Sequence, residues 1–155
     1  MAKFTNVNDL LKHVQQLAAS SLANSANVER VVADEISQAV WDVVYTAYDP
    51  EFYERRGDEG GLSDVRNVEI VDFGVRDGQV FVRFENLTQG DDSLSTVFLT
   101  DTIEEGIKEN WSNPDGPWSE PRAFMAEASR RLNENPGELK DAIRKSLIER
   151  GLKVK

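Results

Sequence analysis

The sequence predicts an α+β protein in which a long N-terminal helix packs on a small antiparallel β-meander, with C-terminal helices. Apolar residues recur every three or four positions after residue 27 and again after residue 121, which is the period of an amphipathic helix. Alternating apolar residues flank Asp77 and Gly78, which is the pattern of a β-hairpin. The 155 residues contain no internal repeat and no inner boundary, so we expect a single domain over residues 1–155.

Two helices are predicted before the first strand. The first covers residues 7–19, capped by Asn6 or Asn8, and a small polar linker follows over residues 19–27. Asn27 is the expected cap of the second, longer helix, and Pro50 ends it because the residue before a proline disfavours the helical conformation. Its buried stripe is predicted to be Val28, Val32, Ile36, Val40, Val44 and Ala47, broadened by Val31, Trp41 and Val43.

A flexible loop and a sheet are predicted in the middle of the chain. Residues 49–66 are rich in glycine and charge, which is typical of a flexible loop. Strands follow over residues 68–75 and 80–87, with a bulge between Ile70 and Val71 where the alternation breaks. Asp77-Gly78 favours a type I′ turn, in which both central residues have positive φ. A third strand is expected over residues 95–99.

The C-terminal third is predicted to be helical around one irregular segment. A short helix covers residues 102–111, and three prolines make residues 112–121 irregular. Pro121 suits the first turn of the next helix, and Gly151 the end of the last one. The apolar faces of these two helices are Phe124, Met125, Ala128 and Leu132, and then Leu139, Ala142, Ile143, Ser146 and Leu147.

Composition excludes several kinds of site. The chain has no cysteine, so disulfides, thiolate zinc sites and thiol nucleophiles are excluded. No apolar run approaches the ~18 residues of a membrane span, and the first residues lack the apolar core of a signal peptide. A net charge of −10 opposes general binding to nucleic-acid phosphates.

The charge is also unevenly distributed. Residues 121–155 hold nine basic and five acidic residues, a net charge of +4, which leaves −14 for residues 1–120. An acidic body with a basic end favours head-to-tail contact between copies, or an acidic partner. A solvated surface whose halves differ in charge accounts for the same numbers.

No catalytic, metal or cofactor site is predicted. His13 is the only histidine, and no partner is arranged around it, so we expect a surface residue. The acid pairs at 91–92 and 104–105 point different ways in a helix or strand and do not form a carboxylate dyad. Residues 57–64 resemble a calcium loop but lack its alternating acids and terminal glutamate. We therefore expect a protein that is not an enzyme.

An aromatic and arginine-rich stretch is the most distinctive feature of the predicted loop. It contains Phe52, Tyr53, Arg55 and Arg56, residue types that dominate protein interfaces. The acidic residues around them would repel phosphates, which disfavours base stacking. We expect these four residues to contact another subunit or anchor the loop, and the tyrosines of the preceding helix to complete its core face.

Two segments follow patterns that occur together in one group of proteins. The first reads Val44-Tyr45-x-x-Tyr48-x-Pro50-x-x-Tyr53-x-Arg55-Arg56 and continues as Gly60-Gly61-Leu62-x-Asp64. The second, Glu120-Pro121-Arg122-Ala123-Phe124-Met125, opens a predicted helix. Over residues 28–132 the chain resembles the small neck or tail proteins of tailed bacteriophages. It departs from them in replacing their Pro-x-Asp-Thr-Gly loop.

The resemblance implies a non-enzymatic virion protein that forms a ring, commonly a hexamer, at the head–tail junction. The roles it leaves open are tail completion, tail termination and head–tail joining. Implied partners are other copies and adjacent neck, tail-tube or connector proteins, with DNA as passing cargo, no membrane and no cofactor. The implied location is the virion, after assembly in the host cytoplasm. The subunit-interface candidates are Phe52, Tyr53, Arg55, Arg56, Arg122 and Phe124.

Two other classes of function compete with this one. A small acidic phage or bacterial binding or regulatory protein would capture a basic protein partner. A hydrolase that uses acidic residues would need converging carboxylates, which the spacing does not provide.

Overall fold

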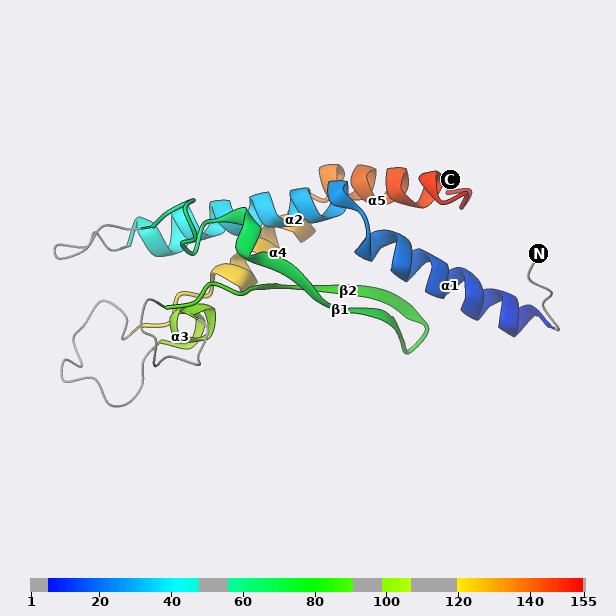
Figure 1. Ribbon diagram of the computed structural model, residues 1–155, viewed down its shortest axis with the longest axis horizontal. Coiled ribbons are helices and arrows are strands. Elements are labelled where there is room, and N and C mark those ends of the chain that lie inside the picture. Colours follow the sequence, from blue (N-terminus) through cyan, green and yellow to red (C-terminus); the bar gives the residue numbers. More distant parts are fainter. Residues whose placement is uncertain (1–5, 48–55, 91–98, 107–119, 155) are drawn as a thin grey trace. The chain divides into compact units, whose positions relative to one another are not determined.

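The computed structural model describes residues 6–47, 56–90, 99–106 and 120–154. It confirms the α+β class, with five α-helices and a two-stranded antiparallel sheet in the described residues (Figure 1). None of the described helices combines the length and the apolar character that crossing a membrane requires.

The chain divides into two compact units, each assembled from segments far apart in the sequence. Unit 1 comprises Met1–Val31, Ile70–Glu85 and Gly137–Lys155, and unit 2 comprises Val32–Glu69 and Asn86–Pro136. The boundaries fall inside the second helix, inside both strands and before the last helix. That the two units fold together as a single domain stays a prediction.

Helix α1 (Val7–Ala23) begins at its predicted cap and is longer than predicted. The Asn6 side chain accepts a hydrogen bond from the Asp9 amide at 2.9 Å. The predicted linker is helical as far as Ala23, because Ser21 is buried against helix α5 (Gly137–Glu149). Ser21 Oγ donates to the Ser146 carbonyl at 3.1 Å, and Ser146 Oγ donates to the Ser21 carbonyl at 2.9 Å. These small side chains let α1 and α5 pack closely within unit 1.

Helix α2 (Ala26–Ala39) starts one residue before the predicted cap, and Ser25 caps it instead of Asn27. Ser25 Oγ accepts from the Val28 amide at 3.3 Å. The buried stripe is confirmed at Val28, Val31, Val32, Ile36, Val40 and Val44, whereas Val43 is only half-buried.

The predicted helix does not continue as an α-helix up to Pro50. A π-helical turn, η1 (Val40–Tyr45), follows α2, and the Thr46 amide bonds the Trp41 carbonyl five residues earlier. This wider turn changes the direction of the side chains, so Trp41 and Ala47 are exposed and do not broaden the core face. The Trp41 and Tyr45 rings make an edge-to-face contact at 4.8 Å.

Strands β1 (Val68–Arg76) and β2 (Gln79–Asn86) form the predicted hairpin, preceded by a short 3₁₀ turn, η2 (Val65–Asn67). Asp77 and Gly78 have φ values of 52° and 75°, which confirms the type I′ turn. The predicted bulge is absent, since burial alternates without interruption from Val68 to Val75. Residues 95–98 of the predicted third strand lie outside the described residues, and Leu99 begins a helix.

Three helices follow the sheet. Helix α3 (Leu99–Glu105) starts three residues earlier than predicted. Residues 107–111 at the end of the predicted helix, and most of the predicted irregular segment, lie outside the described residues. Helix α4 (Phe124–Glu134) begins three residues after Pro121, so the proline precedes the helix. Helix α5 ends as predicted, with Gly151 at a φ of 81°.

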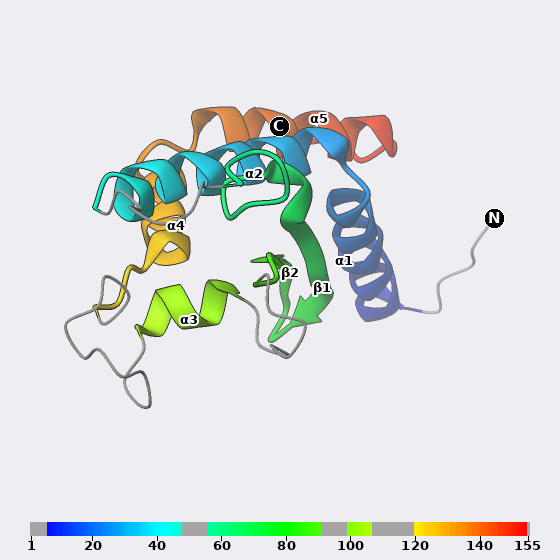
Figure 2. The same ribbon diagram turned by 60° about the vertical axis from the view of Figure 1, so that its left-hand side comes forward.

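The larger part of the buried apolar core belongs to unit 2, where α2, η1, α3 and α4 contribute (Figure 2). Its buried apolar residues are Val32, Ala33, Ile36, Ala39, Val40, Val44, Leu62, Val68, Ile103, Phe124 and Ala128. In the described part of unit 1 the buried apolar residues are smaller side chains, namely Ala19, Val28, Val31 and Ala142.

Candidate interface site

The predicted interface residues fall into two groups, both in unit 2. Phe52, Tyr53 and Arg55 lie outside the described residues, so their predicted contacts stay predictions. Arg56, Arg122 and Phe124 are described.

The structure shows how the two ends of the 48–55 segment are held. On one side, the Tyr45 hydroxyl at the end of η1 accepts a hydrogen bond from the Ser63 amide at 3.3 Å. On the other side, exposed Arg56 donates through Nη2 to the Gln89 carbonyl at 2.6 Å. Arg56 therefore anchors the predicted loop to the chain just after β2, which is one of the two roles expected for it.

Asp64 is the centre of the segment that follows. Its side chain is only 3% exposed, and its carboxylate accepts bonds from Arg66 Nη2 at 2.6 Å and from the Gly60 amide at 2.7 Å. The bonds from Arg66 are the main reason that the pKa of Asp64 lies well below its usual range. The carboxylate is therefore charged near neutral pH, and it holds residues 60–66 in a tight turn.

A buried polar network joins this turn to the end of β2. Asn86 Nδ2 donates to the Leu62 carbonyl at 2.7 Å, and Thr88 Oγ1 donates to Asn86 Oδ1 at 2.6 Å. Gly61 is required by close packing, because a Cβ there would lie 2.5 Å from the Gly57 carbonyl oxygen. The Gly60-Gly61-Leu62-x-Asp64 motif thus has a structural role: it forms a hydrogen-bonded turn in the C-terminal part of the predicted loop.

Arg122 and Phe124 lie at the start of α4. The Arg122 amide donates to the Ile103 carbonyl at 2.8 Å. Phe124 is completely buried, so we assign it to the core of unit 2 and not to a subunit interface. The Met125 amide donates to Glu104 Oε1 at 2.5 Å, and burial raises the pKa of this glutamate. Glu104 of α3 therefore caps α4, whose own Ala123 offers no side-chain acceptor.

An arginine-centred cluster joins α4 to α2 and η1. Arg131 contacts Glu127 at 2.7 Å, Asp42 at 2.8 Å and Glu35 at 3.7 Å. Bonds from Arg130 and Arg131 lower the pKa of Glu127 to about 2, and the bond from Arg131 also lowers the pKa of Asp42. These carboxylates serve to hold helices together.

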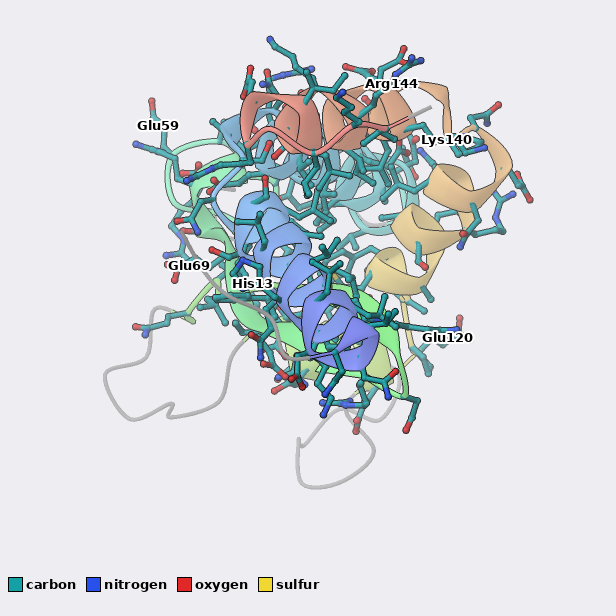
Figure 3. All side chains as sticks on the ribbon, turned by 90° about the vertical axis from the view of Figure 1, so that its right-hand side faces the viewer. His13, Glu59, Glu69, Glu120, Lys140 and Arg144 are labelled. Carbon is teal, nitrogen blue, oxygen red and sulfur yellow. The ribbon has the colours of Figure 1, made fainter. Side chains whose placement is uncertain are left out.

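Sequence reasoning missed the Asp64 network, the Asn86 network and the Glu104 cap. The Asp64 network had a signal in the sequence, since Asp64 belongs to the motif that carries the resemblance and its partner Arg66 follows two positions later. His13 is exposed on α1, as predicted (Figure 3). Among the described residues, no three acidic or histidine side chains are grouped so that they could hold a metal ion.

Comparison with known proteins assigns the chain to a family. A family model described as YomN matches residues 6–149. The chain belongs to the YomN family. It is 29% identical over 159 residues, with 99% of each chain covered, to the SPbeta prophage-derived uncharacterized protein YomN of Bacillus subtilis (strain 168). No solved structure matches. The prophage origin of this relative indicates that the chain is a phage-associated protein.

Proposed function

We propose that the chain is a non-enzymatic structural protein of a tailed-phage head–tail junction that assembles as a ring. The observation that carries the proposal is the match, over nearly the whole chain, to a prophage-derived relative. The motifs at 44–64 and 120–125, which resemble those of neck and tail-completion proteins, support a role at this part of the virion. Tail completion, tail termination and head–tail joining are three forms of this role, and the test below would support the proposal in each case.

The anchored loop supports the proposal. Tyr45 and Arg56, which precede and follow residues 48–55, are both held by hydrogen bonds, and the buried Asp64 holds the turn at residues 60–66. A segment held at both ends can present Phe52, Tyr53 and Arg55 to a neighbouring subunit at a lower entropic cost than a free tail. Its partners are then other copies of the chain and adjacent neck, tail-tube or connector proteins, with DNA passing as cargo.

The proposal is tested by removing the gene from the phage that encodes the chain and imaging the particles. We expect DNA-filled heads separated from tails, and restoration by the wild-type gene in trans. The double variant Tyr53→Ala with Arg56→Ala should fold, as judged by circular dichroism, and fail to restore joining. Normal particles in the absence of the chain would refute the proposal.

A second function is favoured by the charge of unit 2. This unit holds seven basic and 20 acidic residues, a net charge of −13. Such a surface suits a small binding or regulatory protein that captures a basic protein partner. Native mass spectrometry separates the two functions: a ring supports the structural role, and a stable monomer bound to one host protein supports the regulatory role.

A further inference from the structure

We propose that an apolar surface on unit 1 binds unit 2 of a second copy, so that copies join head to tail. This surface consists of Leu10, Leu11 and Val14 of α1 and Val71, Phe73 and Val75 of β1. The inference rests on the ring assembly of the proposed function and adds which surfaces meet.

Beyond Glu69 at the start of β1, one face of the hairpin is apolar. Its two-residue turn places Val75 opposite Val80, Phe73 opposite Val82 and Val71 opposite Phe84. The three residues of β1 on this face are exposed, and Phe73 is 48% exposed. An exposed apolar face of this kind marks an interaction site more often than a solvated surface.

Except for Glu69, the charged residues of the two strands lie on the opposite face. There Arg76 contacts Asp72 at 3.6 Å and covers the Phe81 ring at 4.8 Å. Arg83 contacts Glu85 at 2.9 Å. The two faces of the hairpin therefore differ in character: water solvates the exposed arginines of one face, and the exposed apolar side chains of the other would gain from contact with a partner.

Helix α1 adds a second group of exposed apolar residues near the hairpin tip. Gln15 Nε2 donates to the Gly78 carbonyl at 2.7 Å, which holds α1 beside the hairpin tip (Figures 1 and 2). Leu10, Leu11 and Val14 of the same helix are exposed, Leu11 by 53%. The fully buried apolar residues of the described part of unit 1 are alanines and valines, while several larger ones, such as Leu11 and Phe73, are exposed.

The net charges of the two units indicate that unit 2 of another copy binds this surface. Unit 1 holds 11 basic and eight acidic residues, a net charge of +3, against −13 for unit 2. The positive charge of unit 1 comes from residues 137–155, which hold six basic and three acidic residues, whereas hairpin residues 70–85 hold two basic and three acidic residues. Exposed Lys140 and Arg144 extend outward from α5 in unit 1 (Figure 3). Pairing the apolar surfaces of two copies would bring two positive units together, whereas unit 1 against unit 2 brings opposite charges together. A contact between different surfaces of identical subunits repeats from copy to copy, and it closes into a ring when the rotation between successive copies divides a full turn evenly.

Two substitutions at one exposed position test the proposal. Phe73→Glu and Phe73→Lys both remove the ring, and neither residue favours a strand, so they differ mainly in the sign of the charge. Circular dichroism and thermal unfolding check the fold, and sedimentation velocity measures self-association. We expect the wild type to form oligomers and Phe73→Glu to associate about tenfold more weakly than Phe73→Lys, because the partner surface is acidic. A monomeric wild type, or equal association of the two variants, overturns the proposal.

Cross-linking of the wild-type protein supplies a measurement that does not depend on a variant. A carbodiimide joins lysine to carboxylate without a spacer, and mixing isotopically labelled with unlabelled chains identifies links between copies. We expect Lys140 or Lys145 of unit 1 to be joined to acidic residues of unit 2 in another copy, such as Glu59, Asp101 or Glu105. Links between copies that join unit 1 only to unit 1 overturn the proposal, as does a wild type that binds duplex DNA through these lysines and does not self-associate.

The results separate this inference from the proposed function. Head-to-tail association in solution, together with normal virions in the absence of the chain, would leave the inference standing and refute the virion role. Tailless heads together with unit 1-to-unit 1 cross-links would do the reverse.

Discussion

Replacement of Phe124 by alanine distinguishes a core residue from an interface residue at the start of α4. Because Phe124 is completely buried, the change removes the transfer free energy of the ring, about 1.5–3 kcal/mol, and leaves a cavity. The sum expected for such a site is about 3–5 kcal/mol. Alanine is a good helix former, so no loss of helix propensity is added. We expect the urea midpoint to fall by about 1–5 M at a typical slope of about 1–3 kcal/mol per molar.

Phe73→Ala is the matched control, because it removes the same ring from a half-exposed position on β1. Its effect on unfolding should be well below that of Phe124→Ala, and its main effect should be on self-association. Urea unfolding followed by circular dichroism measures the first quantity, and sedimentation velocity the second. If Phe124→Ala unfolds at the wild-type midpoint and loses association, then Phe124 is an interface residue after all and its assignment to the core is wrong.

Three further outcomes are expected. Gly78→Val should destabilise the protein by about 1 kcal/mol or more in urea, since a β-branched residue resists the φ of 75° at the hairpin tip; an unchanged midpoint would argue against the turn. The pKa of Glu127 falls from an ordinary value of 4.5 to about 2 on folding, so its contribution to stability is present above pH 4.5 and lost as the pH falls towards 2. The melting temperature should therefore rise with pH across this range, and it should rise less steeply in Glu127→Gln. An equally steep rise in the variant would contradict the role assigned to Glu127. The amides of Gly61 and Asp64, bonded to the Gly57 and Gly61 carbonyls, should exchange slowly with deuterium in the free protein; fast exchange would instead support mobility throughout residues 49–66.

Local patterns predicted the fold class and most of the elements. The cap at Asn6, the turn at Asp77-Gly78 and the end at Gly151 were predictable because each depends on the conformational preference of one or two neighbouring residues. The valine stripe of α2 was predictable because helical spacing determines which side chains share a face.

The errors came from interactions between distant parts of the chain. The length of α1 depends on Ser21 meeting Ser146, which is 125 residues away in the sequence. The start of α4 depends on Glu104, and no local signal identifies a cap supplied by another helix. The exposure of Trp41 depends on the π-helical turn, which the apolar spacing does not distinguish from an α-helix. At the candidate site, the sequence identified Arg56 and the glycine motif but not the Asp64–Arg66 pair that holds the motif in place.

The cap that Glu104 provides has a consequence for the order in which unit 2 acquires its structure. With 11 residues and no side-chain cap of its own, α4 is shorter than the ~12–15 residues at which isolated helices become marginally stable. A peptide covering residues 120–136 should therefore be largely unstructured, and α4 should become helical only when α3 is present to receive it. Only then would Arg131 reach Asp42, 89 residues earlier in the chain. Contacts of such long range slow folding, so closure of α4 onto η1 is expected to be a late step, and newly made chains would acquire this part of unit 2 last.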